Sequence, residues 1–147
     1  MTREDIARRS VSAKDRRVLR ELGKQIAEIA AMPVQHETIA LWKALNGLRP
    51  VRTMVMVDQV PWHEMDVDGE LTLRSEDGFC QGIETTLRRT LYSWRHIRVD
   101  MVVEPIAVIP KAIHSDGFGV GIQETRLATD LHNEIVSHAY VDQLETE

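Results

Sequence analysis

Two short apolar runs, separated by one long amphipathic segment, constrain the fold of this chain most. The runs are Thr53–Val57 and Val99–Val103, and an acid, Asp58 or Glu104, closes each one. We interpret both as continuous apolar strands, which are typical of parallel sheets covered by helices on both faces. Residues 77–95 predict a helix between them. The order strand, helix, strand indicates a βαβ unit with a right-handed crossover.

Apolar residues at helical spacing predict three helices. The first covers about residues 12–31 and has Ser12 as its N-cap, and the second covers residues 35–46 and ends at a glycine. The third, residues 77–95, carries a single apolar stripe. The stripe consists of Cys80, Ile83, Leu87, Leu91 and Trp94.

The expected fold class is therefore α/β. Residues 1–52 form an N-terminal helical segment, and residues 53–147 form a parallel-sheet segment. A further β-like run, Ile106–Ile109, follows the second strand. Two weaker strand signals lie beyond it, one within Asp116–Glu124 after a glycine-rich turn and one within Ile135–Leu144.

The composition limits which binding partners and which cellular compartment we expect. The net charge of −5 gives no general reason to expect nucleic acid or an anionic membrane as a partner. Seven basic residues lie in the first twenty positions, which favours a solvated N-terminal helix over an RNA-binding arm. No apolar run approaches the length of a membrane span. The single cysteine excludes an internal disulfide, so we expect a cytoplasmic protein.

Polar side chains gather where the two predicted strands end. In parallel α/β folds, ligands bind beyond the carboxyl ends of the strands. Six candidate side chains lie at these ends or directly after the first: Asp58, Gln59, Trp62, His63, Glu64 and Glu104. We expect them to form the rim of a pocket, and the alternative is a loop that only caps the sheet.

Two longer stretches carry a family resemblance. "LWKALNGLRPVRTMVMVDQVPWHEM", Leu41–Met65, and "LRRTLYSWRHIRVDMVVEP", Leu87–Pro105, resemble the N-terminal part of the uroporphyrinogen decarboxylase superfamily. The chain looks most like the corrinoid-dependent methyltransferase-type members of anaerobic bacteria. True decarboxylases carry the segment R-Q-A-G-R-Y after their first strand, and here only Gln59 of the stretch from Asp58 to Trp62 fits it.

The resemblance implies a TIM barrel, which this chain fills only in part. A barrel of about 250 residues spends roughly 31 on each βα unit, so residues 53–147 hold about three of the eight units. The chain is then either an N-terminal piece of a longer enzyme or a short protein that pairs with another copy. Zinc, where the family uses it, is held by the C-terminal half. The present segment is expected to bind no cofactor itself.

Three functions remain open. The first is methyl transfer between a small methylated substrate and a corrinoid carried by a partner protein. In this role Asp58, His63 and Glu104 would be the catalytic acids, and Gln59, Trp62 and Glu64 would contact the substrate. The second is a non-catalytic module or subunit whose exposed strand edges recruit a partner. The third is decarboxylation of a different anionic substrate.

Overall fold

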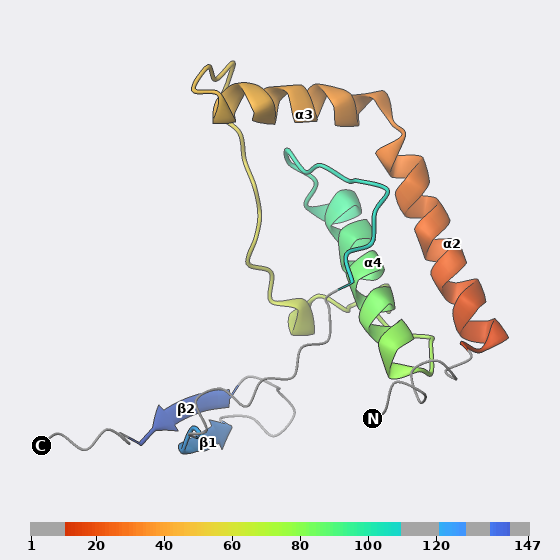
Figure 1. Cartoon of the computed structure of the whole chain (residues 1–147), viewed down its shortest axis with the longest axis vertical. Helices are drawn as coiled ribbons and strands as arrows, with labels where there is room; N and C mark the ends of the chain where they lie inside the picture. The colour runs from red at the N-terminus through yellow and green to blue at the C-terminus, as the bar shows by residue number, and fades with distance from the viewer. Residues whose placement is uncertain (1–10, 110–120, 129–135, 142–147) are drawn as a thin grey trace, which may run out of the picture. The chain divides into compact units, whose positions relative to one another are not determined.

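The computed structural model describes residues 11–109, 121–128 and 136–141. The chain divides into two compact units, with the boundary between Ile109 and Pro110. Within the described ranges, the first unit holds three helices and one 3-10 turn, and the second holds two strands (Figure 1). The boundary expected after residue 52 falls inside the first unit.

The first helix, α2 (Ala13–Ala30), begins as the sequence predicts. The Ser12 hydroxyl is its N-cap and accepts a hydrogen bond from the backbone N–H of Asp15 at 3.0 Å. The buried apolar side chains of α2 recur every three or four residues, so they lie on one face. They are Leu22, Ile26 and Ile29.

The second helix, α3 (Pro33–Asn46), starts with proline at its first position and ends at Gly47. It holds the segment after α4 through two side chains. The Trp42 indole N–H donates to the Asp100 carbonyl at 2.8 Å, and the side-chain oxygen of the buried Gln35 accepts from the Val103 N–H at 2.9 Å.

The third helix, α4 (Gly78–His96), lies beside α2 (Figure 1). The Asp77 carboxylate caps it by accepting from the backbone N–H groups of Phe79 and Cys80. The two helices enclose the core, which consists of Leu22, Ile26, Ile29, Leu87, Leu91 and Val103. All three predicted helices are therefore confirmed. Within the described ranges, none of the helices has the length and apolarity to cross a membrane.

The predicted parallel sheet is wrong. Thr53–Val57, Val99–Val103 and Ile106–Ile109 contain no strand, and the strands of the described residues form one two-stranded antiparallel sheet. The prediction of about three βα units of a TIM-barrel-like fold is overturned with it. The first run is instead an extended segment, outside any strand, between α3 and the 3-10 turn η1 (Trp62–Glu64) (Figure 1).

The helices pack on each other and leave the first run uncovered. A central parallel strand needs hydrogen-bonded neighbours and a cover on both faces. In contrast, Val55, Met56 and Val57 are 48%, 72% and 46% exposed. The second run begins in a turn, because Val99 has a positive φ of 34° and the Met101 N–H bonds the Arg98 carbonyl at 2.9 Å. A β-branched residue seldom adopts that backbone conformation inside a strand.

The second unit is the antiparallel pair β1 (Glu124–Ala128) and β2 (Val136–Tyr140). Its register places Glu124 opposite Tyr140, and the Val141 N–H extends the pairing by donating to the Gln123 carbonyl at 3.0 Å. The strand predicted within 135–144 is confirmed at β2. Of the glycine-rich turn and short strand predicted within 116–124, residues 116–120 lie outside the described residues, and residues 121–123 form no strand before β1 begins at Glu124.

Candidate functional site

The sequence-predicted site residues occupy two places in the first unit. Asp58 and Gln59 are exposed on the extended segment, and Trp62, His63 and Glu64 form η1. Glu104 is exposed directly after the buried Val103. No described hydrogen bond or ion pair joins Asp58 or Glu104 to another of the six residues. Because the parallel sheet is absent, their joint site stays a prediction.

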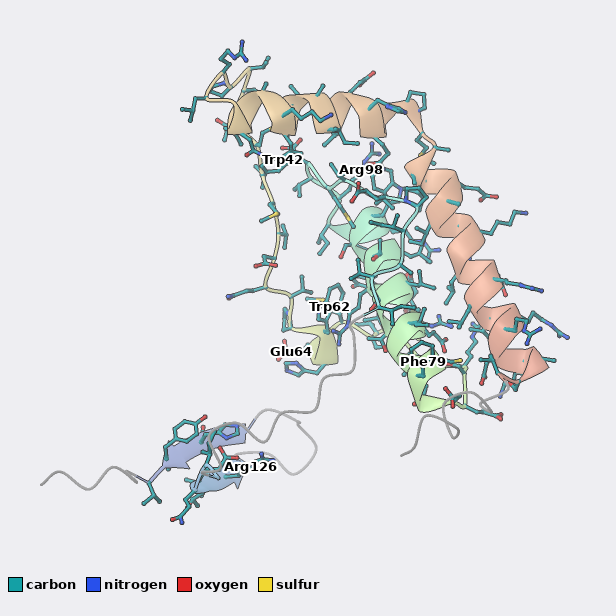
Figure 2. All side chains as sticks on the ribbon, in the orientation of Figure 1. Trp42, Trp62, Glu64, Phe79, Arg98 and Arg126 are labelled. Carbon is teal, nitrogen blue, oxygen red and sulfur yellow. The ribbon has the colours of Figure 1, made fainter. Side chains whose placement is uncertain are left out.

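Trp62 anchors the turn to α4. Its half-buried indole meets the Tyr92 ring edge-on, with 6.0 Å between ring centroids and 80° between ring planes. The Arg89 guanidinium lies 5.2 Å from the Trp62 ring centroid, within the range of a cation–π contact. Figure 2 shows the Trp62 side chain in this position beside α4. These contacts show that the Trp62 indole packs on α4, so its position needs no bound substrate to explain it.

His63 and Glu64 of η1 contact each other. The His63 Nε2 atom lies 3.4 Å from a carboxylate oxygen of Glu64, and both side chains are exposed. An exposed pair of neighbours such as this contributes little to stability.

The strongest polar junction in this region was missed by the sequence reasoning. Asp100 accepts hydrogen bonds from two guanidinium nitrogens of Arg52 and from the Val55 N–H at 2.8 Å. The Asp100 N–H in turn donates to the Val55 carbonyl at 3.3 Å. Arg52 and the Val55 N–H lower the pKa of Asp100 to about 2. The available signal was an acid inside a run interpreted as an apolar strand.

A second missed feature is the buried carboxylate of Glu84 on α4. Glu84 accepts from the backbone N–H groups of Arg74 and Ser75, from the Ser75 hydroxyl and from Arg88 Nε at 2.7 Å. Burial alone would raise the pKa of Glu84, but the Ser75, Arg74 and Arg88 donors outweigh it and lower the pKa to about 2. The carboxylate is charged and fully satisfied, so its role is structural.

A polar cavity of about 200 Å³ lies between α2 and α4. Glu70, which lines it, binds Arg95 at 2.7 Å and His96 at 2.9 Å. Arg95 also donates to Gln25 at 2.9 Å. Arg95, followed by His96, lowers the pKa of Glu70. The charges around this cavity largely neutralise one another, which gives no preference for a cation or an anion.

An apolar cavity of about 400 Å³ lies behind the extended segment, and Trp42, Met56, Ile97 and Met101 are among its lining residues. The segment is therefore not packed tightly against the helices. Met56 and Val57 of this segment line the cavity and are also exposed to solvent.

Comparisons with family models, curated proteins and solved structures found no match for this chain. The resemblance to the uroporphyrinogen decarboxylase superfamily stays a prediction. Within the described ranges, no three His, Cys, Asp or Glu side chains gather in a group able to hold a metal ion.

Proposed function

We propose that this chain is a non-catalytic interaction module that presents residues 52–58 as a β-strand for pairing with another polypeptide. The observation that carries the proposal is the extended segment itself, whose apolar side chains at Val55, Met56 and Val57 are exposed. Monomeric proteins rarely leave contiguous apolar surface and an open strand edge uncovered.

One edge of the segment is occupied and the other is open. The N–H and carbonyl groups of Val55 bond Asp100. Along an extended chain, the backbone groups of alternate residues point to opposite edges. Those of Met54 and Met56 therefore point away from Asp100, and no described residue bonds them. These groups form the edge at which a partner strand would add.

Pairing would also give the exposed side chains cross-strand neighbours. Each apolar side chain would contact a cross-strand neighbour, and such a pair contributes about 0.2–1 kcal/mol. These contacts add to the backbone hydrogen bonds of the pair, and we expect weak binding because association itself carries a substantial free-energy cost. Arg52 and Asp100 hold the segment in place beforehand, so less conformational entropy is lost on pairing.

Hydrogen exchange of the Met54 and Met56 amides tests the proposal. Synthetic apolar peptides of strand-forming sequence are added to the purified chain, and exchange at these two amides is followed by NMR. We expect them to slow on addition of peptide. Unchanged exchange across a panel of such peptides would contradict the proposal.

A matched pair of proline variants locates the edge. Met56→Pro removes an N–H on the open edge, whereas Val57→Pro removes one on the opposite edge. Both side chains are exposed, and proline suits an extended edge segment. We expect Met56→Pro to weaken peptide binding about tenfold or more and Val57→Pro to change it much less.

Methyl transfer with a corrinoid protein is the second candidate. Its support is that the two acid-terminated runs are neighbours in space, since Val55 and Asp100 bond each other. Asp58, His63 and Glu104 would supply the acid, a small methylated compound would be the substrate, and the location would be cytoplasmic. The proposal assigns no metal to the described residues. Methyl transfer to free reduced cobalamin, abolished by Asp58→Asn, would favour this candidate over the module.

A further inference from the structure

We infer that the strand which pairs with residues 52–58 is the same segment of a second copy of this chain, running antiparallel about a two-fold axis at Val55. The inference rests on the proposed strand pairing and names its partner. It comes from three properties of the segment: its sequence symmetry, the phase of its backbone groups and its terminal charges.

The segment reads Arg-Thr-Met-Val-Met-Val-Asp. In an antiparallel pair centred on Val55, Met54 lies opposite Met56, Thr53 lies opposite Val57, and Arg52 lies opposite Asp58. Every apolar position then faces an apolar or β-branched residue of the other copy. Both ends bring opposite charges together, which stabilises cross-strand pairs.

The backbone phase permits this register and excludes those shifted from it by one residue. In an antiparallel pair, residues that exchange two hydrogen bonds alternate with residues that exchange none. Val55 already bonds Asp100 through its N–H and carbonyl groups, so it must occupy a non-hydrogen-bonded position. Centring on Val55 does this, and it makes Met54 and Met56 exchange both of their bonds across the axis.

Another antiparallel register, or a parallel pair, loses the match between apolar side chains or the match between opposite charges. Centring on Met56 places Met54 opposite Asp58 and leaves Arg52 opposite Val60. A parallel pair sets Arg52 beside Arg52 and Asp58 beside Asp58, and like charges in those positions are destabilising. Asp58 is exposed, and the Arg52 side chain is half exposed although it also bonds Asp100. The charges of Arg52 and Asp58 therefore favour the antiparallel orientation of the two strands and contribute little to the affinity of the dimer.

The interface is small. Seven residues from each copy fall well below the roughly 800 Å² per partner of a standard stable interface. We therefore expect a reversible dimer whose population rises with protein concentration.

Cysteine cross-linking tests the register. Residues facing each other at a non-hydrogen-bonded position have Cα atoms about 4.5 Å apart, which suits a disulfide. Val55→Cys should therefore give a disulfide-linked dimer under mild oxidation. Val57→Cys is the matched control, because residue 57 lies opposite residue 53 and roughly 13 Å along the strand from its own mate. The native Cys80 is buried in both variants.

A charge exchange tests the ends of the pair. Asp58→Arg places like charges opposite each other at both ends, so we expect the dimer dissociation constant to rise about tenfold. Arg52→Asp does the same with acids. Mixing the two variants restores both opposite-charge pairs and should restore dimerisation as a heterodimer. If Arg52→Asp fails to fold, Asp58→Arg and the cysteine pair still decide the question.

The outcomes separate this inference from the proposed module. Val55→Cys cross-linking without Val57→Cys cross-linking supports it. Equal cross-linking of both, or a chain that is monomeric at all concentrations in light scattering, overturns it. If peptides still slow the Met54 and Met56 amides of such a monomer, the module stands and its partner is a different polypeptide. If they do not, both proposals fail.

Discussion

Asp15 on α2 and Glu84 on α4 together bind four successive backbone N–H groups, those of residues 74 to 77. Glu84 takes the N–H groups of Arg74 and Ser75 at 2.9 and 2.8 Å, and Asp15 takes those of Glu76 and Asp77 at 2.9 and 3.3 Å. Both carboxylates are buried, at 0% and 1% exposure for Glu84 and Asp15. They fix the chain as it enters α4 and so set how the two helices meet.

Glu84→Gln should destabilise the first unit strongly. The change removes the charge that balances the buried Arg88 and disturbs the donors from Arg74 and Ser75. Removing one partner of a buried ion pair costs about 3–5 kcal/mol of the free energy of unfolding. Urea unfolding followed by circular dichroism measures the loss.

Glu28→Gln is the matched control for that change. Glu28 also pairs with a basic residue four positions away, Lys24, but at 3.8 Å and with both side chains exposed. We expect its free energy of unfolding to stay within about 0.5 kcal/mol of the unmodified chain. A similar loss in both variants would show that burial is not what makes Glu84 important.

Acid should unfold the first unit through Glu84. Its pKa is about 2 in the folded chain against an ordinary value of 4.5, because the Ser75, Arg74 and Arg88 donors outweigh the effect of burial. The folded state therefore binds its proton less readily than the unfolded state. The stabilisation is complete above about pH 4.5 and is lost as the pH falls toward 2.

Urea midpoints measured at intervals across that range check the pH dependence. Asp100, whose pKa is also lowered to about 2, contributes in the same direction. The slope of stability against pH should be shallower in Glu84→Gln, and an unchanged slope would count against the assignment.

The helices were predictable because their signals are local. Ser12 caps α2, Gly47 follows the end of α3, and Asp77 caps α4, and each of these preferences acts within one turn of the residue. The buried stripe of α4 follows from helical periodicity alone. Asp15 and Glu84 gave no comparable signal, since an acid on a helix is usually solvated and their partners are backbone groups elsewhere in the chain.

The sheet could not be inferred from the same kind of pattern. An apolar run of five residues fits a buried strand, but it also fits an extended segment that belongs to no sheet. Asp100 lies inside the second run, where it ties down Arg52 and Val55. The predicted site depended on adjacent parallel strands, so the geometric argument that joined Asp58 and Glu104 was lost when neither run proved to be a strand.

Asp100→Ala and Gln35→Met should each free a different backbone amide from its hydrogen bond. Asp100 accepts from the Val55 N–H, and Gln35 accepts from the Val103 N–H. We expect Asp100→Ala to speed exchange of the Val55 amide about tenfold or more and to change the Val103 amide little. Gln35→Met should have the opposite pattern. Equal acceleration of both amides in either variant would indicate general loosening of the unit instead of two separate anchors.

The chain by itself should show no methyltransferase activity. Asp58, His63 and Glu104 are all exposed, and a site open to water loses most of the electrostatic advantage that an enclosed catalytic site provides. The measurement follows the absorbance of free reduced cobalamin during incubation with a methylated alcohol or amine and the purified chain. We expect the spectrum to match a control without protein. Methylation that requires the protein and disappears in both Asp58→Asn and Glu104→Gln would instead identify these acids as catalytic and replace the module by an enzyme.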